Sequence, residues 1–239
     1  MEREIDLRPS CVFPEGCDDP EDRHEYFEAT AGGAETAAQW LGGLLRAGCA
    51  AEEQLPAGYL EDPFVLGFAF SFLSSYKRDW RYEETDAEFA LEVFVGLFRD
   101  NRGAVLHARA LELLAAADPD FVRGSENGAR FHRADIDPEN CGDDVLFVMA
   151  ERRAKEHMTK VRKHIPTGLG YEFALARYRR PACYDAYFMD VLRERFPDKV
   201  EWHQSALERL PNPDPDDIDY DSLSDEEFQA LLQHEEAVA

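Results

Sequence analysis

The sequence predicts a mainly α-helical protein, with a single compact domain of about seven to nine helices between an acidic arm and an acidic tail. Apolar residues recur three and four positions apart, capping residues precede several of these runs, and the sequence has no internal repeat or parallel-strand pattern. We expect residues 1–30 to form an irregular acidic arm and residues 31–210 to form the helical domain. Residues 211–239 are predicted to form a Pro/Asp linker that ends in a short helix.

The composition is that of a folded and strongly acidic protein. Of the 239 residues, 44% are hydrophobic and 32% are charged, and the formal net charge is −24. A charge of that sign repels nucleic acid and anionic membranes as a whole-molecule field, and it attracts basic partners. A basic protein surface is therefore the simplest partner, while adaptation to a salty cytoplasm and plain solubility are alternative explanations of the acidity.

The cysteines and the apolar runs favour a cytoplasmic protein. The five cysteines are widely separated and none has zinc-ligand spacing, which indicates a reducing compartment. The N-terminus lacks the apolar core of a signal sequence. The most apolar run, residues 64–73, covers about half of a bilayer core, so we expect it to form a buried helix and expect no membrane contact.

Two helices are predicted at the start of the domain. One covers residues 34–47, with Gly48 in the position of a left-handed cap. Its apolar residues at helical spacing are Ala37, Trp40, Leu41, Leu44 and Leu45. The second helix follows Asp62, an N-cap residue, and Pro63, a proline at the first helical position, and it contains residues 64–73. The alternating phenylalanines of that run also permit a strand.

Two more helices are predicted before residue 118. Thr85 and Glu88 form a T-x-x-E capping box before residues 89–98, whose apolar side chains surround most of the helix and predict a place at the centre of the core. A helix over residues 104–117 is stopped by Asp118 and Pro119. Its apolar residues on one line are Ala104, Ala108, Leu111 and Ala115.

The next segment, residues 120–144, predicts a long loop because it is rich in Gly, Asn, Asp and Glu. Only residues 131–136 are expected to form a short extended piece. Loops of this length inside a compact domain are uncommon and often functional.

The last part of the domain is predicted to be helical again. Asp143 or Asp144 caps a helix over residues 145–165, which Pro166 and Gly168 close. Its narrow apolar stripe is Phe147, Ala150, Ala154, Met158, Val161 and Ile165. Shorter helices, separated by prolines at positions 181 and 197, are expected at residues 171–178, 184–196 and 201–210.

Residues 145–200 differ from the rest of the chain in charge, because twelve Lys and Arg stand against seven Asp and Glu. The predicted basic patch of this segment is Arg152, Arg153, Lys155, Lys160, Arg162, Lys163, Arg177, Arg179 and Arg180. Tyr171 and Tyr178 lie nearby in sequence, so the patch suits contact with phosphates and stacked bases. The alternatives are a solvated helix face, pairing with the acidic arms, and contact with another protein.

Two hexapeptides have the pattern R-x4-H: RGAVLH, with Arg102 and His107, and RRAKEH, with Arg152 and His157. They resemble the motif of the helical HEPN ribonucleases over six residues each. The resemblance implies that the arginine and the histidine flank the scissile phosphate and that the histidine serves in acid/base chemistry. Neither hexapeptide has the polar Asn, Asp or His that commonly follows the arginine in that family.

No other catalytic pattern is present in the sequence. It lacks H-E-x-x-H, G-x-S-x-G and a glycine-rich phosphate loop, so we assign no catalytic residue, no metal site and no cofactor. Residues 216–228, DDIDYDSLSDEEF, begin like an EF-hand loop. Ser222, however, stands where that loop needs glycine, and Phe228 stands where it needs a bidentate glutamate.

The same acidic stretch fits the start of a helix without exceptions. Ser224 is a suitable N-cap and Glu227 completes a capping box. The predicted tail helix then carries a partner-binding apolar face, which consists of Leu223, Phe228, Leu231 and Leu232.

These observations rank three functions. The first is a non-enzymatic acidic protein of the inhibitor, immunity or adaptor type, whose carboxylates cover a basic site on another protein. The second is nucleic-acid association through residues 152–180. The third is a HEPN-like ribonuclease.

Overall fold

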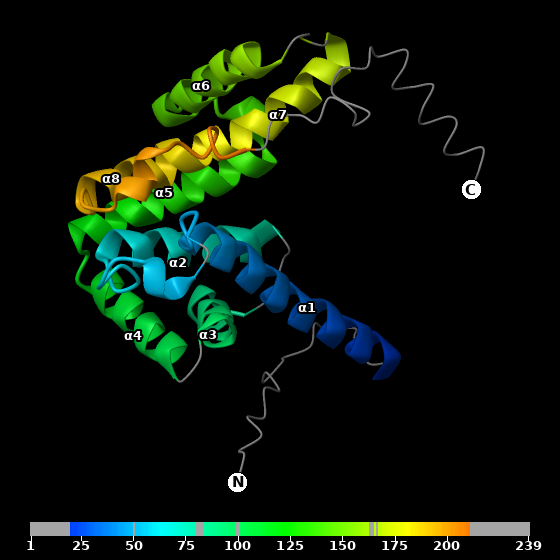
Figure 1. Ribbon diagram of the computed structural model, residues 1–239. Helices are drawn as coiled ribbons and strands as arrows, with labels where there is room; N and C mark the ends of the chain where they lie inside the picture. Colours follow the sequence, from blue (N-terminus) through cyan, green and yellow to red (C-terminus); the bar gives the residue numbers. More distant parts are fainter. Residues whose placement is uncertain are drawn as a thin grey trace. The chain divides into compact units, whose positions relative to one another are not determined.

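The computed structural model describes residues 20–49, 51–79, 84–98, 101–162, 165 and 167–210, with side chains from Gly33 onward. Over these residues the protein is mainly α-helical and contains no β-strand, which confirms the predicted fold class (Figure 1). The α-helices are α1 (Pro20–Leu45), α2 (Pro63–Asp79), α3 (Asp86–Leu97), α4 (Arg102–Ala115), α5 (Pro119–Ile136), α6 (Val145–Val161), α7 (Gly168–Tyr184) and α8 (Asp190–Arg195). A π-helical turn covers Asp185–Met189, and 3-10 turns cover Glu52–Gln54, Pro138–Asn140 and Val200–His203.

The contacts between residues divide the protein into two units. Unit 1 contains α1 to α4 and the part of α5 that ends at Ser125, and unit 2 contains the rest of α5, α6 to α8 and the segment Arg46–Tyr59. Helix α5 therefore supplies residues to both units. The domain boundaries predicted at residues 30 and 210 stay predictions, because residues 1–19 and 211–239 lie outside the described part of the chain.

The helix starts of unit 1 confirm the predicted caps. Asp62 Oδ1 accepts hydrogen bonds from the backbone N–H groups of Phe64, at 2.9 Å, and Val65, at 3.3 Å. In the capping box of α3, the N–H of Glu88 donates to Thr85 Oγ1 at 3.2 Å, and the N–H of Thr85 donates to Glu88 Oε2 at 2.9 Å. Local sequence therefore determines where α2 and α3 begin.

Helices α2 and α5 approach each other through two glycines. A Cβ atom at Gly67 would lie 2.1 Å from the carbonyl oxygen of Phe121, and a Cβ atom at Gly124 would lie 2.1 Å from the carbonyl oxygen of Phe64. Each glycine thus faces the backbone of the other helix, which no residue with a side chain allows at this distance. The rings of Phe70 and Phe121 pack beside this crossing with centroids 6.3 Å apart. This crossing buries the apolar run of α2 and excludes the alternative strand.

The predicted loop over residues 120–144 is wrong, because α5 occupies most of it. Asp118 is the N-cap of this helix, and its Oδ1 accepts the N–H groups of residues 120 and 121 at 3.0 Å each. The buried face of α5 includes Phe121, Gly124, Asn127 and Phe131, at steps of three and four. Glycine and asparagine on this face are contact residues and not helix breakers. Residues 131–136, predicted to be extended, are helical as well.

The predicted break at Pro181 is also wrong. Helix α7 continues through Pro181, and the π-helical turn then leads directly into α8, so residues 168–195 form one helical run. Proline has no N–H to donate and it crowds the preceding turn, which is a common cause of helix distortion. The third short helix, predicted over residues 201–210, is only a 3-10 turn, Val200–His203, followed by further turns.

Helix α1 begins earlier than predicted, and its apolar face is narrower. It starts at Pro20, so residues 20–30 are helical where an irregular arm was expected. Ala37, Leu41 and Leu45 are buried, whereas Trp40 is 41% exposed.

Helices α3 and α4 bury other faces than those predicted. On α3 only one face is buried, with Phe89, Ala90, Val93 and Phe94, and Leu91 is 37% exposed, so α3 does not lie at the centre of the core. On α4 the predicted line of Ala104, Ala108, Leu111 and Ala115 is exposed or half-buried. The buried residues of α4 are Gly103, Leu106, His107, Ala110 and Leu113. Gly103 lies on this face because a Cβ atom there would be 2.1 Å from the carbonyl oxygen of Phe94.

In unit 2 the stripe predicted for α6 is confirmed for Phe147, Ala150, Ala154 and Met158, which are buried. The helix ends at Val161 and not at residue 165. Asp144 is its N-cap and accepts the N–H groups of residues 146 and 147.

The chain after α8 packs through aromatic rings and one arginine. The ring of Trp202 lies 5.4 Å from that of Tyr59 and 5.8 Å from that of Phe196. Arg193 donates hydrogen bonds to the carbonyl oxygens of residues 202 and 204 and to the carboxylate of Asp185, at 2.9 Å. These contacts fix residues 200–206 on the α7–α8 run.

Candidate functional site

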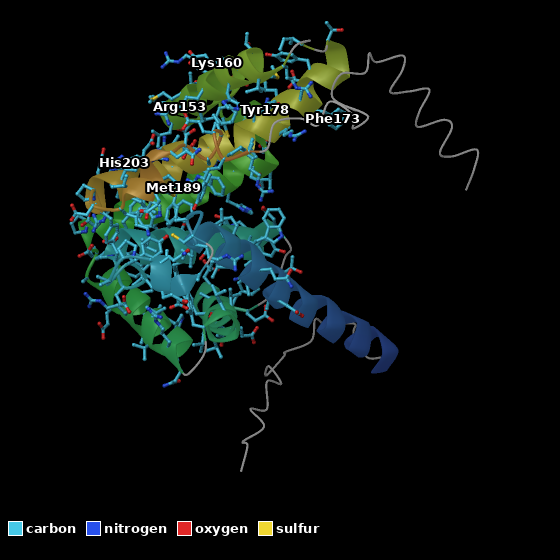
Figure 2. All side chains as sticks on the ribbon, in the orientation of Figure 1. Arg153, Lys160, Phe173, Tyr178, Met189 and His203 are labelled. Atoms are coloured by element: carbon cyan, nitrogen blue, oxygen red, sulfur yellow. The ribbon has the colours of Figure 1, made fainter. Side chains whose placement is uncertain are left out.

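The predicted basic patch lies on α6 and α7, which pack against each other; Figure 2 shows Arg153 on α6 and Tyr178 on α7. Several of its charges are paired inside unit 2. On α6, Arg153 Nη1 lies 2.7 Å from Asp190 Oδ2, and Lys155 Nζ lies 3.3 Å from Glu151 Oε2.

The arginines of α7 are paired in the same way. Arg179 Nη2 lies 3.5 Å from both Glu151 Oε1 and Glu172 Oε2. Arg180 Nε lies 3.2 Å from Asp135 Oδ1, on α5. The partners of these cations are acidic residues of the folded helices.

The other members of the patch differ in exposure. Arg162 is buried, whereas Arg152, Lys160 and Arg177 are exposed on the surfaces of α6 and α7. Figure 2 labels Lys160 near the end of α6. Lys163 lies outside the described residues.

The described residues of unit 2 carry almost no net charge. Over residues 46–49, 51–59, 126–162, 165 and 167–210, fifteen Lys and Arg stand against seventeen Asp and Glu, which gives a net charge of −2. The basic patch therefore exposes less positive charge than the sequence count over residues 145–200 suggests.

A cavity of about 240 Å³ lies beside this patch, between α5 and α7. Its lining is Phe131, Ala134, Asp135, Pro138, Ala176, Arg179, Arg180 and Cys183. Large side chains hold the two helices apart at this level, because the ring of Phe131 contacts those of Tyr184 and Tyr187, at centroid distances of 6.3 and 6.4 Å. The cavity thus combines aromatic and small apolar groups with two guanidinium groups and one carboxylate.

Burial changes the acid–base properties of two lining residues. It raises the pKa of Asp135, against the opposing effects of the cation of Arg180 and of His132. Burial also raises the pKa of the Cys183 thiol to about 12, which keeps the thiol protonated at neutral pH. Cys183 is therefore a packing residue and not a nucleophile, whereas Asp135 is a carboxylate that gains from a cationic neighbour.

The two R-x4-H pairs have different surroundings. His107 is buried beside the ring of Phe94, and burial lowers its pKa although a hydrogen bond to the backbone of Ala87 opposes the shift. Arg102 lies near the surface, 3.5 Å from Glu61. The two side chains of this pair thus differ in burial, with His107 buried and the Arg102 side chain 42% exposed.

The second pair, Arg152 and His157, lies on α6. The ring of His157 packs on that of Tyr178, with centroids 5.6 Å apart. Burial and the cation of Lys160 lower the pKa of His157, although the carboxylate of Glu208 opposes this. The imidazole has a packing partner, and neither geometry specifically supports a ribonuclease site.

Three glutamates of unit 1 are spaced four positions apart at α3. Glu88 and Glu92 lie on one line of the helix, whereas Glu84 precedes the N-cap residue Thr85. Glu88 also takes part in the capping box, and Lys77 forms an ion pair with Asp86, at 2.8 Å. Burial raises the pKa of Glu92, and so do the negative charges of Glu84 and Glu88. We call these three residues the carboxylate row.

The excess negative charge of the chain lies outside the described residues of unit 2. Over residues 33–45, 60–79, 84–98 and 101–125 of unit 1, eleven Asp and Glu stand against five Lys and Arg. In the terminal segments the ratio is ten to three over residues 1–32 and ten to none over residues 211–239. Carboxylates without a matching number of cations are thus concentrated on unit 1 and in the two termini.

Sequence reasoning missed the cavity, because Phe131 and Asp135 were assigned to a loop. The Asp118-Pro119 pair, which resembles the start of α2, was the signal that could have revealed α5. The predicted tail-helix face, Leu223, Phe228, Leu231 and Leu232, lies outside the described residues.

The described part of the chain has neither a metal-binding cluster nor a membrane-spanning helix. It contains no group of three or more His, Cys, Asp or Glu side chains arranged to hold a metal ion. None of its helices combines the length and the apolar character needed to cross a bilayer. In comparisons with known proteins, no family model, no curated protein and no solved structure matches this chain.

Proposed function

We propose that this protein is a non-enzymatic binding protein of the inhibitor, immunity or adaptor type, and that its carboxylates cover a basic surface of another protein. The observation that supports this proposal is the uneven distribution of charge. The described residues of unit 2 are nearly neutral, whereas the excess of carboxylates lies on the described residues of unit 1 and in residues 1–32 and 211–239. Complementary charge of this kind orients a partner and accelerates its association.

The carboxylate row is the part of unit 1 that we assign to the partner. Like charges four positions apart destabilise a helix by about 0.2–0.5 kcal/mol per pair. Glu92 also carries a raised pKa, caused by burial and by Glu84 and Glu88. Lysine or arginine side chains of a partner, placed along the row, would offset this repulsion and favour the ionised form of Glu92.

The test removes the charge of the row without changing its shape. Glu84→Gln, Glu88→Gln and Glu92→Gln are combined in one variant, and glutamine at position 88 preserves the capping box. A control variant removes the same charge from exposed positions of unit 2: Glu53→Gln, Glu139→Gln and Glu201→Gln. Both variants and the wild type are used for cross-linked affinity purification from the native lysate.

We expect the wild type and the control variant to recover a basic protein in a stoichiometric amount, and the row variant to lose it. Recovery of no stoichiometric protein would contradict the proposal, as would equal recovery by both variants. Nucleic acid that copurifies and is released by moderate salt would instead favour the alternative function of the basic patch.

The tail helix is tested separately by deletion of residues 212–239. If the deletion leaves both stability and partner recovery unchanged, the predicted apolar face of the tail has no part in binding. A loss of recovery without a loss of stability would assign the tail to the partner interface.

A further inference from the structure

We propose that the cavity between α5 and α7 binds a small zwitterion of the class of a free aliphatic α-amino acid, with its carboxylate on Arg179 and its ammonium group on Asp135. The cavity lies wholly in unit 2, so this inference does not rest on the proposed protein-binding function. Three properties of the lining support it: a buried cationic donor, a carboxylate acceptor and an apolar wall.

The donor is the guanidinium of Arg179. Its side chain is 13% exposed, and its Nε atom is buried without a hydrogen-bond partner among the described residues. Both of its ion pairs, with Glu151 and Glu172, use Nη2 at 3.5 Å. A buried donor without an acceptor costs free energy, and a carboxylate is the acceptor that a guanidinium matches best. Arg179 lines the cavity, so a ligand carboxylate there would lie beside its guanidinium.

The acceptor is the carboxylate of Asp135. Its Oδ1 atom pairs with Arg180 Nε at 3.2 Å, and Arg180 lies at the rim with its side chain 44% exposed. The carboxylate has a second oxygen, Oδ2, to offer to a ligand. Because burial raises the pKa of Asp135, a further cation beside it stabilises its ionised form. An ammonium group meets that requirement with several N–H donors.

The rest of the lining sets the size and the character of the ligand body. Phe131, Ala134 and Cys183 are buried apolar groups, and Pro138 and Ala176 complete the wall. A volume of about 240 Å³ is below the range of about 300–1,000 Å³ that is typical for larger organic ligands. It equals the space of roughly eight liquid water molecules. A branched aliphatic group of three or four carbons fits such a space.

The charges around the cavity favour a zwitterion over a simple ion. A phosphate or a dicarboxylate would meet Asp135 in the lining and the two glutamates behind Arg179, and it would be repelled by the net charge of −24. A simple cation would meet two guanidinium groups. A zwitterion carries no net charge and places each of its charged groups beside the opposite charge.

The binding test uses isothermal titration calorimetry on the full chain. The probes are L-valine and L-leucine, and the comparison compounds are 4-methylpentanoate, which lacks the amino group, 3-methylbutylamine, which lacks the carboxylate, and inorganic phosphate. We expect saturable binding of L-valine or L-leucine, and at least tenfold weaker binding of the three comparison compounds. Binding of phosphate or 4-methylpentanoate as tight as that of the amino acids would overturn the proposal.

Three variants locate the site. Arg179→Gln and Asp135→Asn each remove one charged contact, and each should weaken binding at least tenfold. Ala176→Leu adds bulk at an exposed position of the cavity lining without changing a charge, and both residues are good helix formers. Two matched controls are Ala108→Leu and Arg109→Gln, at exposed positions of α4 in unit 1.

Circular dichroism checks that every variant is folded. If Arg179→Gln or Asp135→Asn unfolds the protein, Ala176→Leu decides, because it leaves both charged residues in place. Unchanged affinity of Ala176→Leu would overturn the proposed site. The absence of binding of both amino acids to the wild type at 10 mM, about a hundred times a dissociation constant of about 0.1 mM, would overturn it as well.

Discussion

The crossing of α2 and α5 gives the sharpest prediction about stability. Replacement of Gly67 by alanine adds a Cβ atom 2.1 Å from the carbonyl oxygen of Phe121, 2.9 Å from its carbonyl carbon and 3.0 Å from the N atom of Ser125. Ordinary contacts of a Cβ atom begin at 3.4 Å, so the two backbones must separate by about 1 Å. All three neighbouring atoms belong to the backbone of a helix, and no rotamer change relieves the clash.

The size of the effect follows from two opposing contributions. Overpacking of a core costs typically about 1–3 kcal/mol, and we expect the upper end here because a whole helix must move. Alanine in place of glycine in a helix interior returns about 1 kcal/mol through backbone entropy. The net loss in the free energy of unfolding is therefore about 2 kcal/mol.

The assay is urea denaturation followed by circular dichroism, with Gly43→Ala as the matched control. Gly43 lies in α1, and a Cβ atom there would meet nothing within 4 Å, so this substitution should stabilise the protein by about 0.5–1 kcal/mol. If Gly67→Ala is as stable as the wild type while Gly43→Ala gains stability, the backbone contact between α2 and α5 is not present in solution.

Three further predictions concern single side chains. Thr85→Ala removes the capping box of α3 and should cost about 1 kcal/mol in the free energy of unfolding, measured by urea denaturation. If this free energy does not change, the capping box does not contribute to stability. Burial holds the pKa of His107 below that of the unfolded chain, so on acidification below pH about 6.5 the unfolded state takes up more protons and stability falls. In His107→Gln the free energy of unfolding should decrease less on acidification than in the wild type. His203→Gln, at an exposed position, should not have this effect. Arg193→Met leaves the buried carboxylate of Asp185 without its cation and should cost about 3 kcal/mol in the free energy of unfolding. The double variant with Asp185→Asn should recover part of this loss. If the losses of the two single variants simply add in the double variant, the pair is not coupled.

The helix starts are the part of the fold that the sequence predicts best, because a cap is a local interaction. Asp62, Thr85 and Asp144 each bind N–H groups two or three residues further along the chain. Such a contact depends on few neighbours, so its residue types are enough to identify it. The buried faces are less predictable, since the partner helix decides them. On α4 the buried line passes through Gly103 and His107, which no scale of hydrophobicity selects.

The candidate site escaped sequence prediction for the same reason. The cavity requires α5 to lie beside α7. The prediction assigned most of α5 to a loop because of its glycines and asparagines, and it divided the α7 run at Pro181.

Two of the five Asp-Pro pairs of the sequence show which local signal identifies a helix start. Asp62-Pro63 and Asp118-Pro119 have the same sequence, and in both the Asp Oδ1 atom accepts the N–H groups two and three residues ahead. The first pair was interpreted as a helix start because phenylalanines follow it, and the second as a helix end because glycine and asparagine follow. In the structure one of those glycines, Gly124, allows α5 to contact α2 closely. The capping pair was therefore the more reliable signal, because it depends on backbone hydrogen bonds that are the same in both helices.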